Sequence, residues 1–348
     1  MPALVIQTSF LGDTVLTTPL IAELASRGPV DVVVTPVGAT ILRGHPAVRS
    51  LIVYDKRGTD AGIGGLRRLA RRLRGERYEA AYLAQGSLRS AVLARAAGIA
   101  RRVGFDTSAG RILYTERIHY RRDAHHAERL WRLAAGDDAP APAPAADVLR
   151  PRLYPGADER TAVDALLGDF ACGGPLVGLA PGSIWGTKRW PHFAALAAGL
   201  AEVRFVVIGS ADDTALAQAI IAAAPGPPGP PGPPGRVLDA TGRLSLLASA
   251  ELIGRCAALV ANDSAPTHLA SGVGTPTLTL FGPTVPGFGF GPLAPRSESI
   301  GLEQLACRPC HPHGPMTCPL GHFLCMRSLE PSRVMTRLRN LLVPITTS

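Results

Sequence analysis

Long apolar runs are missing from this chain of 348 residues. A membrane-spanning helix needs about 20 consecutive apolar residues, and no run approaches that length, so we expect no transmembrane helix. The N-terminus also lacks a basic segment followed by an apolar stretch, so we expect no signal peptide and a cytoplasmic protein.

Several nucleotide and nucleic-acid signatures are missing too. No G-x-G-x-x-G follows the first predicted strand, which disfavours a nicotinamide dehydrogenase, and there is no Walker phosphate loop. Aromatic residues are only 5% of the chain, and no motif of a nucleic-acid-binding module occurs. We therefore expect no nucleic-acid partner, although the pI is about 9.7.

Positive charge is concentrated in the first half. Residues 1–150 hold 22 Lys and Arg against 14 Asp and Glu, whereas the remainder holds 14 against 13. Such a half predicts contact with a large anion, namely a membrane surface, an acidic glycolipid or a nucleic acid. Solvated surface arginines are the alternative.

One basic helix is predicted over residues 65–77. Leu66, Leu69 and Leu73 fall at i, i+3 and i+7, which makes one stripe apolar. Arginines cover the rest of its surface: Arg67, Arg68, Arg71, Arg72 and Arg74. The helix is either an ordinary surface helix or a contact for anionic lipid headgroups or an acidic acceptor.

Short β-rich runs alternate with helical patterns in both halves, which predicts two α/β domains, each with a doubly wound parallel sheet. Predicted strands occupy residues 4–7, 30–36, 50–55 and 78–84 in the first half, and 175–182, 204–210, 258–263 and 275–283 in the second. Predicted helices include residues 17–26, 88–99, 193–201, 214–224 and 244–256. We expect the two domains to face each other across a cleft.

Composition sets the domain boundaries. Ala-Pro repeats within residues 136–156 predict an extended linker. The first domain is thus residues 1–150 and the second 151–330, while an amphipathic helix at 331–348 is expected to pack back on the first domain. The collagen-like residues 225–235 are too short for a triple helix, so we interpret them as an exposed insertion without chemistry.

Residues 7–19, QTSFLGDTVLTTP, follow the first strand. A Gly-Asp pair stands where a helix begins, so Asp13 is either a helix cap or a carboxylate positioned for chemistry. An aspartate does not suit a phosphate site, which makes this turn unlike the next one.

Residues 179–191, LAPGSIWGTKRWP, join a strand to a helix in the second half. Gly182 and Ser183 offer backbone N–H groups and a hydroxyl, and Lys188 adds a mobile positive charge. These groups suit phosphate oxygens without a metal.

Residues 260–277, VANDSAPTHLASGVGTPT, repeat this arrangement after another strand. Asp263 and Ser264 precede a helix, and His268 lies about one turn further on. Asp263 is either a cap or a sugar ligand, because doubly wound sheets bind ligands at the carboxyl ends of their strands.

Taken together, SFLGDTVLTTP, PGSIWGTKRWP and NDSAPTHLASGVGTPTLTLFGP resemble the motifs of glycosyltransferase family 9, the ADP-heptose:lipopolysaccharide heptosyltransferases, and most closely the heptosyltransferase II type. The resemblance spans essentially the whole chain. It implies the GT-B fold, with the acceptor bound by the first domain and the nucleotide sugar by the second. It also implies an inner-membrane acceptor, the acidic inner core on lipid A, which gives the basic first half a partner at the cytoplasmic face.

The resemblance also implies roles for residues. Asp13 would be the general base of an inverting transfer, with Gly12 allowing close approach of the acceptor. Ser183 and Lys188 would contact the diphosphate, with no metal required for transfer. Asp263, with Ser264 beside it, would hold the heptose hydroxyls. Asp213, preferred over Asp212, would contact the ribose. His268 would lie near the donor. Another GT-B enzyme, including a nucleotide-sugar epimerase, is the alternative, but it leaves the Gly-Asp turn and TKRWP together unexplained.

Four of the six cysteines lie within residues 307–325, CRPCHPHGPMTCPLGHFLC. Their spacing is compatible with structural zinc or an iron–sulfur cluster, or with free thiols or disulfides formed on isolation. The candidate ligands are Cys307, Cys310, Cys318 and Cys325, with His322 nearby. The preceding Gly/Pro-rich segment, residues 282–292, is either a surface loop or part of the donor pocket.

Overall fold

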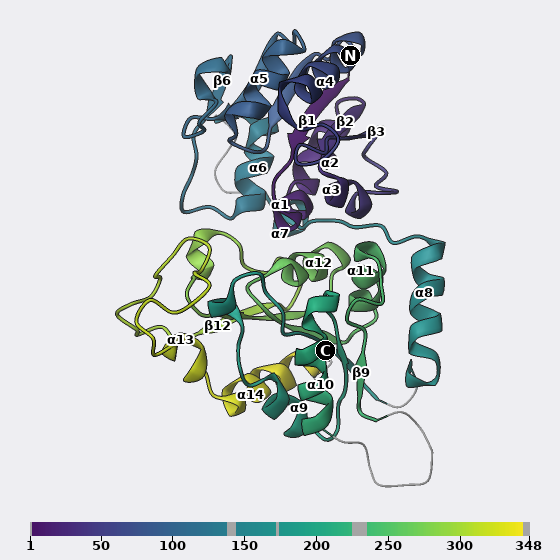
Figure 1. Cartoon of the computed structure of the whole chain (residues 1–348), viewed down its shortest axis with the longest axis vertical. Helices are drawn as coiled ribbons and strands as arrows, with labels where there is room; N and C mark the ends of the chain where they lie inside the picture. Colours follow the sequence, from purple (N-terminus) through teal and green to yellow (C-terminus); the bar gives the residue numbers. More distant parts are fainter. Residues whose placement is uncertain (1, 138–143, 172–173, 225–234, 344–348) are drawn as a thin grey trace. The chain divides into compact units, whose positions relative to one another are not determined.

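The computed structural model describes residues 2–137, 144–171, 174–224 and 235–343. The chain forms two compact units, Met1–Tyr154 and Pro155–Ser348, which we call the first and second domains (Figure 1). The boundary therefore lies close to the one predicted after residue 150.

The first domain is built on a parallel sheet of six described strands in the order β3-β2-β1-β4-β5-β6. The direction of strand addition reverses between β1 and β4, which makes their carboxyl ends the usual ligand position in such a sheet. Nearly continuous apolar, β-branched runs favour buried parallel strands. The strands are β1 (Ala3–Gln7), β2 (Val30–Val34), β3 (Ser50–Val53), β4 (Ala80–Leu83), β5 (Arg101–Phe105) and β6 (Glu116–Ile118).

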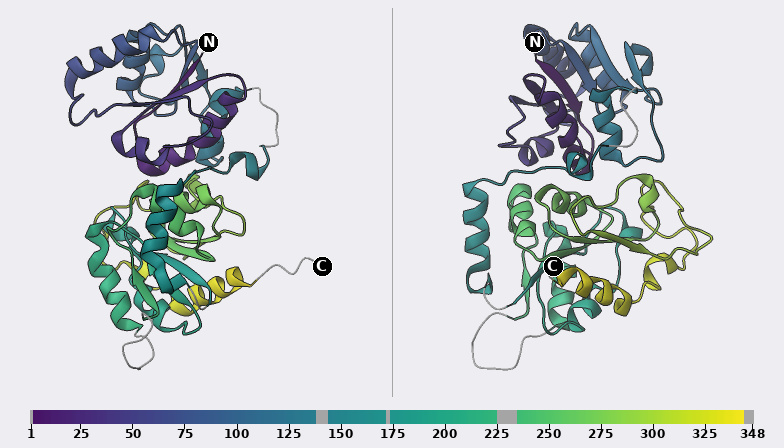
Figure 2. Two further views of the ribbon diagram at one scale, coloured as in Figure 1. Left: turned by 90° about the vertical axis from the view of Figure 1, so that its right-hand side faces the viewer. Right: turned by 180° about the vertical axis from the view of Figure 1, so that it is seen from behind.

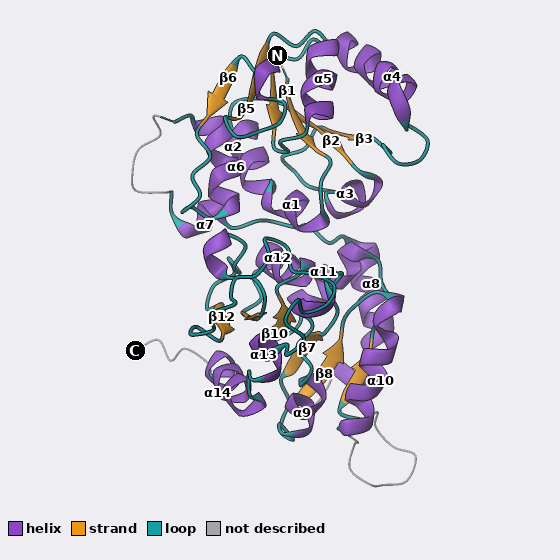
Figure 3. Cartoon of the chain, turned by 60° about the vertical axis from the view of Figure 1, so that its left-hand side comes forward, coloured by secondary structure: helices purple, strands orange, loops and turns teal. Residues whose placement is uncertain are grey.

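Helices cover both faces of this sheet. Helices α4 and α5 lie on one side, and α1, α2, α3 and α6 lie on the other (Figure 3). Their bounds are α1 (Leu11–Leu16), α2 (Thr18–Ala25), α3 (Pro36–Ile41), α4 (Gly62–Gly75), α5 (Leu88–Ala96), α6 (His126–Ala135) and the short α7 (Ala146–Leu149).

The second domain repeats the topology. Its six described strands are all parallel, in the order β12-β11-β10-β7-β8-β9, with the reversal between β7 and β10. Both domains thus confirm the predicted doubly wound α/β fold. The strands are β7 (Leu176–Ala180), β8 (Arg204–Val207), β9 (Val237–Asp239), β10 (Ala258–Asn262), β11 (Thr277–Phe281) and β12 (Glu298–Gly301).

Two groups of helices pack on the second sheet. One group contains α9, α10 and α14, and the other contains α8, α11 and α12 (Figure 2). The bounds are α8 (Ala157–Leu167), α9 (Phe193–Ala198), α10 (Thr214–Ala223), α11 (Leu246–Gly254), α12 (Ala265–Val273), α13 (Leu324–Arg327) and α14 (Pro331–Leu342).

Helix α14 belongs to the second domain, which differs from our expectation that residues 331–348 pack on the first. It contacts α9, β10 and β11. Val334, Leu338 and Leu341 recur at helical spacing on one face and are buried in the second domain's core. The helix has therefore already covered its apolar face. Residues 344–348 lie outside the described part of the chain.

The predicted linker and insertion fall largely outside the described residues. For the insertion at 225–235, only Gly235 is described. The described end of the linker at 136–156 includes α7 instead of being wholly extended, and Leu149 and Leu153 are buried. These two apolar side chains explain why this end of the linker follows the domain surface.

The basic helix is α4, and its apolar stripe faces inward as predicted. Leu69 and Leu73 are buried in the core of the first domain, and Leu66 packs against them. The arginines lie on the exposed side. No helix among the described residues is long and apolar enough to cross a bilayer.

Candidate functional site

The predicted donor-site residues gather where β7 and β10 end. These strands are hydrogen-bonded neighbours in the second sheet. The segment after β7 carries Ser183 and Lys188, and the segment after β10 carries Asp263, Ser264 and His268. The reversal of strand order leaves this edge open to two strand–helix turns at once.

An ion pair joins the two turns. Lys188 Nζ lies 2.6 Å from Asp263 Oδ2, and the two side chains are only 11% and 9% exposed. The hydroxyl of Thr284 donates to the same carboxylate oxygen at 2.6 Å. A buried charge is costly without a partner, so each of these groups holds the other in place.

Asp263 is not a helix cap, which corrects one of the two readings of that residue. Helix α12 takes Ser264 as its N-cap, and no side chain caps its first turn. The carboxylate of Asp263 turns instead toward Lys188. The Ser264 hydroxyl donates to the Asn262 carbonyl at 3.2 Å, within the same turn.

Ser183 lies in the segment after β7, and His268 lies in α12, which follows β10. Ser183 Oγ accepts a hydrogen bond from the Trp185 N–H at 3.2 Å. His268 is 5% exposed, and its ring meets Phe290 edge-on at 6.4 Å. Phe290 and Thr284 both come from residues 282–292, so this segment packs beside His268 and Asp263.

Asp213 lies at the end of the next strand, β8. It is buried, whereas Asp212 is exposed. Its Oδ2 accepts from the N–H and hydroxyl of Ser210, at 2.9 and 3.0 Å. A Cβ built on Gly182 would stand 2.4 Å from Asp213 Oδ1, so only glycine lets the β7 turn pass this carboxylate.

The cysteine-rich segment packs on the β7 turn. The Thr187 hydroxyl donates to the Pro315 carbonyl at 2.5 Å, and the rings of Trp185 and His313 stack at 6.3 Å. A Cβ on Gly314 would contact the Lys188 side chain at 3.3 Å. Residues 307–325 therefore form a wall beside Lys188, a position that their spacing did not predict.

The metal prediction for this segment is not supported. Among the described residues, no group of three or more His, Cys, Asp or Glu is arranged to hold a metal ion. Cys307 Sγ and His322 Nε2 are 4.0 Å apart. Cys325 belongs to the hydrophobic core, and burial raises the pKa of its thiol to about 11. The described cysteines, including Cys310 and Cys318, are free thiols.

In the first domain, Asp13 lies in the first turn of α1. The N-cap of this helix is Phe10 and not Asp13, so the capping interpretation of Asp13 is wrong in position. Asp13 Oδ2 accepts from the Ser9 hydroxyl at 2.6 Å, and the side chain is 21% exposed. Gly12 stands beside it in the same turn.

His126 faces the other carboxylate oxygen of Asp13. Its Nε2 lies 3.8 Å from Asp13 Oδ1, a separation too long for a hydrogen bond. Burial, aided by Arg129 and His125, lowers the pKa of His126 to about 3. The Asp13 carboxylate alone would favour the charged imidazole, but desolvation outweighs it. At neutral pH the pair is therefore a carboxylate beside a neutral ring.

Sequence reasoning missed several neighbours of these residues. Ser9 stood inside the first motif but was given no role, and Thr284 was not singled out within residues 282–292. The adjacent histidines at 125 and 126 were a usable signal, because they mark the N-cap and the first residue of α6. Lys56 donates to the Thr8 carbonyl at 2.6 Å and places a positive charge beside the β1 turn.

Comparisons with known proteins agree on one family. The model of glycosyltransferase family 9 (heptosyltransferase) matches residues 66–321. Lipopolysaccharide heptosyltransferase 2 of Salmonella typhimurium is 28% identical over 98% of this chain and 99% of its own length. Lipopolysaccharide heptosyltransferase 1 of Pseudomonas aeruginosa is 30% identical over 99% and 98%. The solved structure of E. coli ADP-heptose lps heptosyltransferase II shares 27% identity and a TM-score of 0.76, covering 98% of each chain.

The ion pair of Lys188 and Asp263 makes a stability prediction. Lys188→Met leaves the Asp263 carboxylate buried without a counter-charge and should destabilise the second domain by about 3–5 kcal/mol. The double variant Lys188→Met/Asp263→Asn removes both charges and keeps an acceptor for Thr284, so it should recover part of that loss. Hydrogen exchange of peptides covering β7 and β10 measures the effect. Equal protection in the single and double variants would contradict a pair that depends on mutual charge compensation.

Proposed function

The chain belongs to glycosyltransferase family 9, and we propose that this enzyme transfers a heptose from ADP-heptose to the inner core of lipopolysaccharide. The observation that carries the proposal is that relatives named for this transfer match nearly the whole chain. The residues gathered after β7 and β10 have the chemistry that a nucleotide-sugar donor requires.

We propose that Lys188 stabilises the leaving diphosphate. Its ammonium group is held by Asp263 at 2.6 Å, and an incoming phosphate oxygen offers an alternative anionic partner. Ser183 and the backbone N–H groups of its turn would supply further donors. Developing negative charge on ADP would then be met by preorganised protein groups, with no metal assigned to the step.

When the ammonium group of Lys188 binds the diphosphate, Asp263 Oδ2 loses this ionic partner and can accept other hydrogen bonds. In this proposal the carboxylate accepts hydrogen bonds from heptose hydroxyls, while Ser264 and His268 line the donor site. Asp213 would accept from the ribose hydroxyls through Oδ1, because Ser210 already donates twice to Oδ2.

Asp13 is the proposed general base. Its Oδ1 accepts no hydrogen bond from the described residues, while Ser9 fixes Oδ2. Oδ1 takes the proton from an acceptor hydroxyl as that oxygen attacks the anomeric carbon and the bond to the diphosphate breaks. This single displacement inverts the anomeric configuration. The neutral ring of His126 adds no positive charge beside Asp13, and Gly12 lets the acceptor approach.

The first test is the reaction itself. Incubation of the protein with ADP-heptose and a heptose-deficient inner-core lipopolysaccharide should add one heptose, detected by mass spectrometry. Parallel reactions with other nucleotide sugars test the alternative of a different donor. Transfer from one of these and none from ADP-heptose would replace the proposed donor, and no transfer onto any truncated core would reject the acceptor.

The second test concerns Asp13. Asp13→Asn keeps an oxygen for the Ser9 hydrogen bond but removes the base, so turnover should fall by about 10²–10⁴-fold. Affinity for ADP, measured by calorimetry, should not change. Asp158→Asn, which changes an exposed carboxylate of the second domain without a proposed role, is the control. Turnover of Asp13→Asn within a few-fold of wild type would exclude Asp13 as the base.

We further propose peripheral binding of the enzyme to the anionic cytoplasmic face of the inner membrane through α4. The arginines Arg67, Arg71 and Arg72 are exposed on this helix. The leucines of this helix are packed in the domain core, so this face cannot insert into the lipid. Attraction to anionic headgroups would therefore be electrostatic, and weakened by salt.

Vesicle binding measures this attraction. Each arginine near an anionic surface contributes about 1 kcal/mol, so Arg67→Gln/Arg71→Gln should weaken binding to phosphatidylglycerol-containing vesicles by about 30-fold at low salt. Neutral vesicles serve as the lipid control, and Arg337→Gln in the second domain as the protein control. Unchanged binding by the double variant, or binding insensitive to salt, would contradict the proposal.

A further inference from the structure

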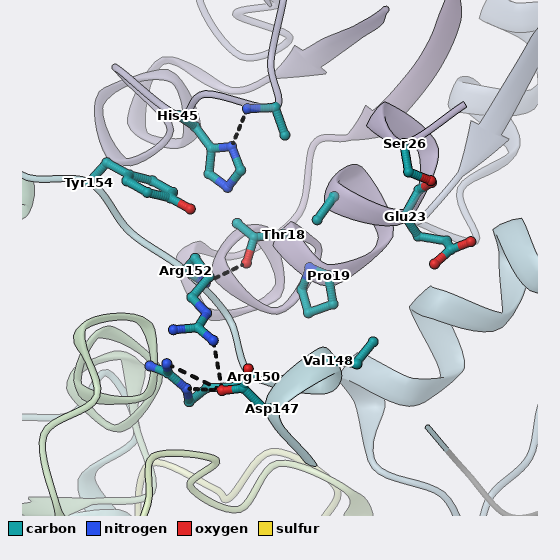
Figure 4. Close-up of a pocket in the computed structure, with 12 residues that line it drawn as sticks. Thr18, Pro19, Glu23, Ser26, His45, Asp147, Val148, Arg150, Arg152 and Tyr154 are labelled. Atoms are coloured by element: carbon teal, nitrogen blue, oxygen red, sulfur yellow. Dashed lines mark hydrogen bonds and ion pairs between the residues drawn. The ribbon is translucent and has the colours of Figure 1, made fainter. Parts of the chain in front are cut away.

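A cavity of about 300 Å³ lies within the first domain, away from Asp13. Its wall comes from one side of α2, from the loop after α3 and from residues 147–154, and none of its lining residues belongs to the β1–α1 turn (Figure 4). A volume of this order is at the lower end for ligand pockets and suits one sugar ring.

His45 is part of the wall of this cavity (Figure 4). The side chain is only 6% exposed, and its Nδ1 accepts a hydrogen bond from the Ala47 N–H at 3.2 Å. Burial lowers the pKa of His45 to about 4, so the ring is neutral at pH 7 and carries its single hydrogen on Nε2. Nε2 has no hydrogen-bond partner within the described residues. Burying an unpaired donor is unfavourable, so a ligand oxygen that accepts a hydrogen bond from Nε2–H would be stabilising here.

Positive charge lines the same cavity. Arg150 and Arg152 both turn toward Asp147 Oδ1, at 3.4 and 2.7 Å, and this carboxylate is 74% exposed. The backbone N–H of Arg152 donates to Thr18 Oγ1 at 3.0 Å, which holds this segment against α2. Two arginines thus share one solvent-exposed counter-charge that an incoming anion can replace.

The second carboxylate in the lining, Glu23, is already committed elsewhere. It pairs with Arg27 and accepts from the Trp131 indole N–H at 3.2 Å. The remaining wall includes Pro19 and the ring of Tyr154, which meets His45 edge-on at 4.9 Å. An apolar surface beside polar groups is the usual composition of a sugar-sized pocket.

We propose that this cavity binds an anionic monosaccharide, with its phosphate or carboxylate group on Arg150 and Arg152 and an oxygen accepting from His45 Nε2–H. The site is separate from the proposed donor and acceptor chemistry and does not depend on it. Because residues 147–154 lead into the second domain, its occupant would contact the segment that joins the two domains.

Calorimetry on the full chain tests the proposal with four probes: inorganic phosphate, glucose 6-phosphate, glucuronate and glucose. Saturable binding of glucose 6-phosphate or glucuronate, with glucose silent, is expected. Binding of glucose 6-phosphate would identify the anionic group as a phosphate, and binding of glucuronate would identify it as a carboxylate. Saturable binding of inorganic phosphate alone would overturn the sugar part of the proposal, and no saturable binding of any anion would overturn all of it.

Variants assign the binding to this cavity. His45→Asn keeps an acceptor near the position of Nδ1 for Ala47 and removes the Nε2 donor. Arg152→Gln removes one charge but leaves the backbone contact to Thr18. Each should weaken binding about ten- to hundredfold. Arg95→Gln, an exposed arginine of the same domain outside the cavity, should bind like wild type. Equal affinity for all three variants would reject the cavity as the site.

A measurement on the unaltered protein covers the case in which His45→Asn fails to fold. In protein labelled with ¹⁵N at histidine, the ligand should shift the Nε2–H resonance of one neutral, non-titrating ring. Binding that moves no such resonance would exclude contact with His45.

Discussion

The contact of Lys188 with Asp263 connects two turns that are far apart in sequence and adjacent in the fold. Their strands, β7 and β10, are neighbours because the sheet reverses direction between them. A charged pair at that edge fixes the spacing of both turns, and Thr284 and residues 307–325 then pack around it. Removing one partner would leave the other charge buried and unpaired, so the surrounding turns share one geometry.

The first domain uses the same topological position for a different electrostatic purpose. Asp13 follows β1 as Lys188 follows β7, but its neighbour is an imidazole kept neutral by burial. A fully paired carboxylate is a poor base, because the partner stabilises its charged form. The second domain thus pairs Lys188 with Asp263, whereas Asp13 in the first domain lies beside a neutral imidazole, a difference that fits the proposed roles of donor binding in the second domain and proton transfer in the first.

Much of this arrangement was predictable from local patterns, because strand–helix alternation specifies a parallel sheet and the ends of parallel strands share one edge. Ser183, Lys188, Asp263 and His268 were therefore identified together. Their contacts were not, since the pairing of Lys188 with Asp263 depends on strand order. Neither Asp13 nor Asp263 is a cap: α12 takes Ser264, one residue after Asp263, and α1 takes Phe10, three residues before Asp13. Local patterns do not specify helix starts to the residue.

Residue spacing alone did not separate the alternative interpretations of the cysteine-rich segment and of α14, and the burial of their side chains adds the missing information. Cys325 has metal-like spacing from its neighbours, yet its side chain packs in the same core as Leu338. Burial and the nearby thiols of Cys310, Cys318 and Cys307 raise the pKa of Cys325. The apolar stripe of α14 could likewise pack on any apolar surface. In the structure it covers a face of its own sheet, at β10 and β11. Both elements therefore serve the second domain: one completes its core, and the other forms the wall against which Lys188 is held.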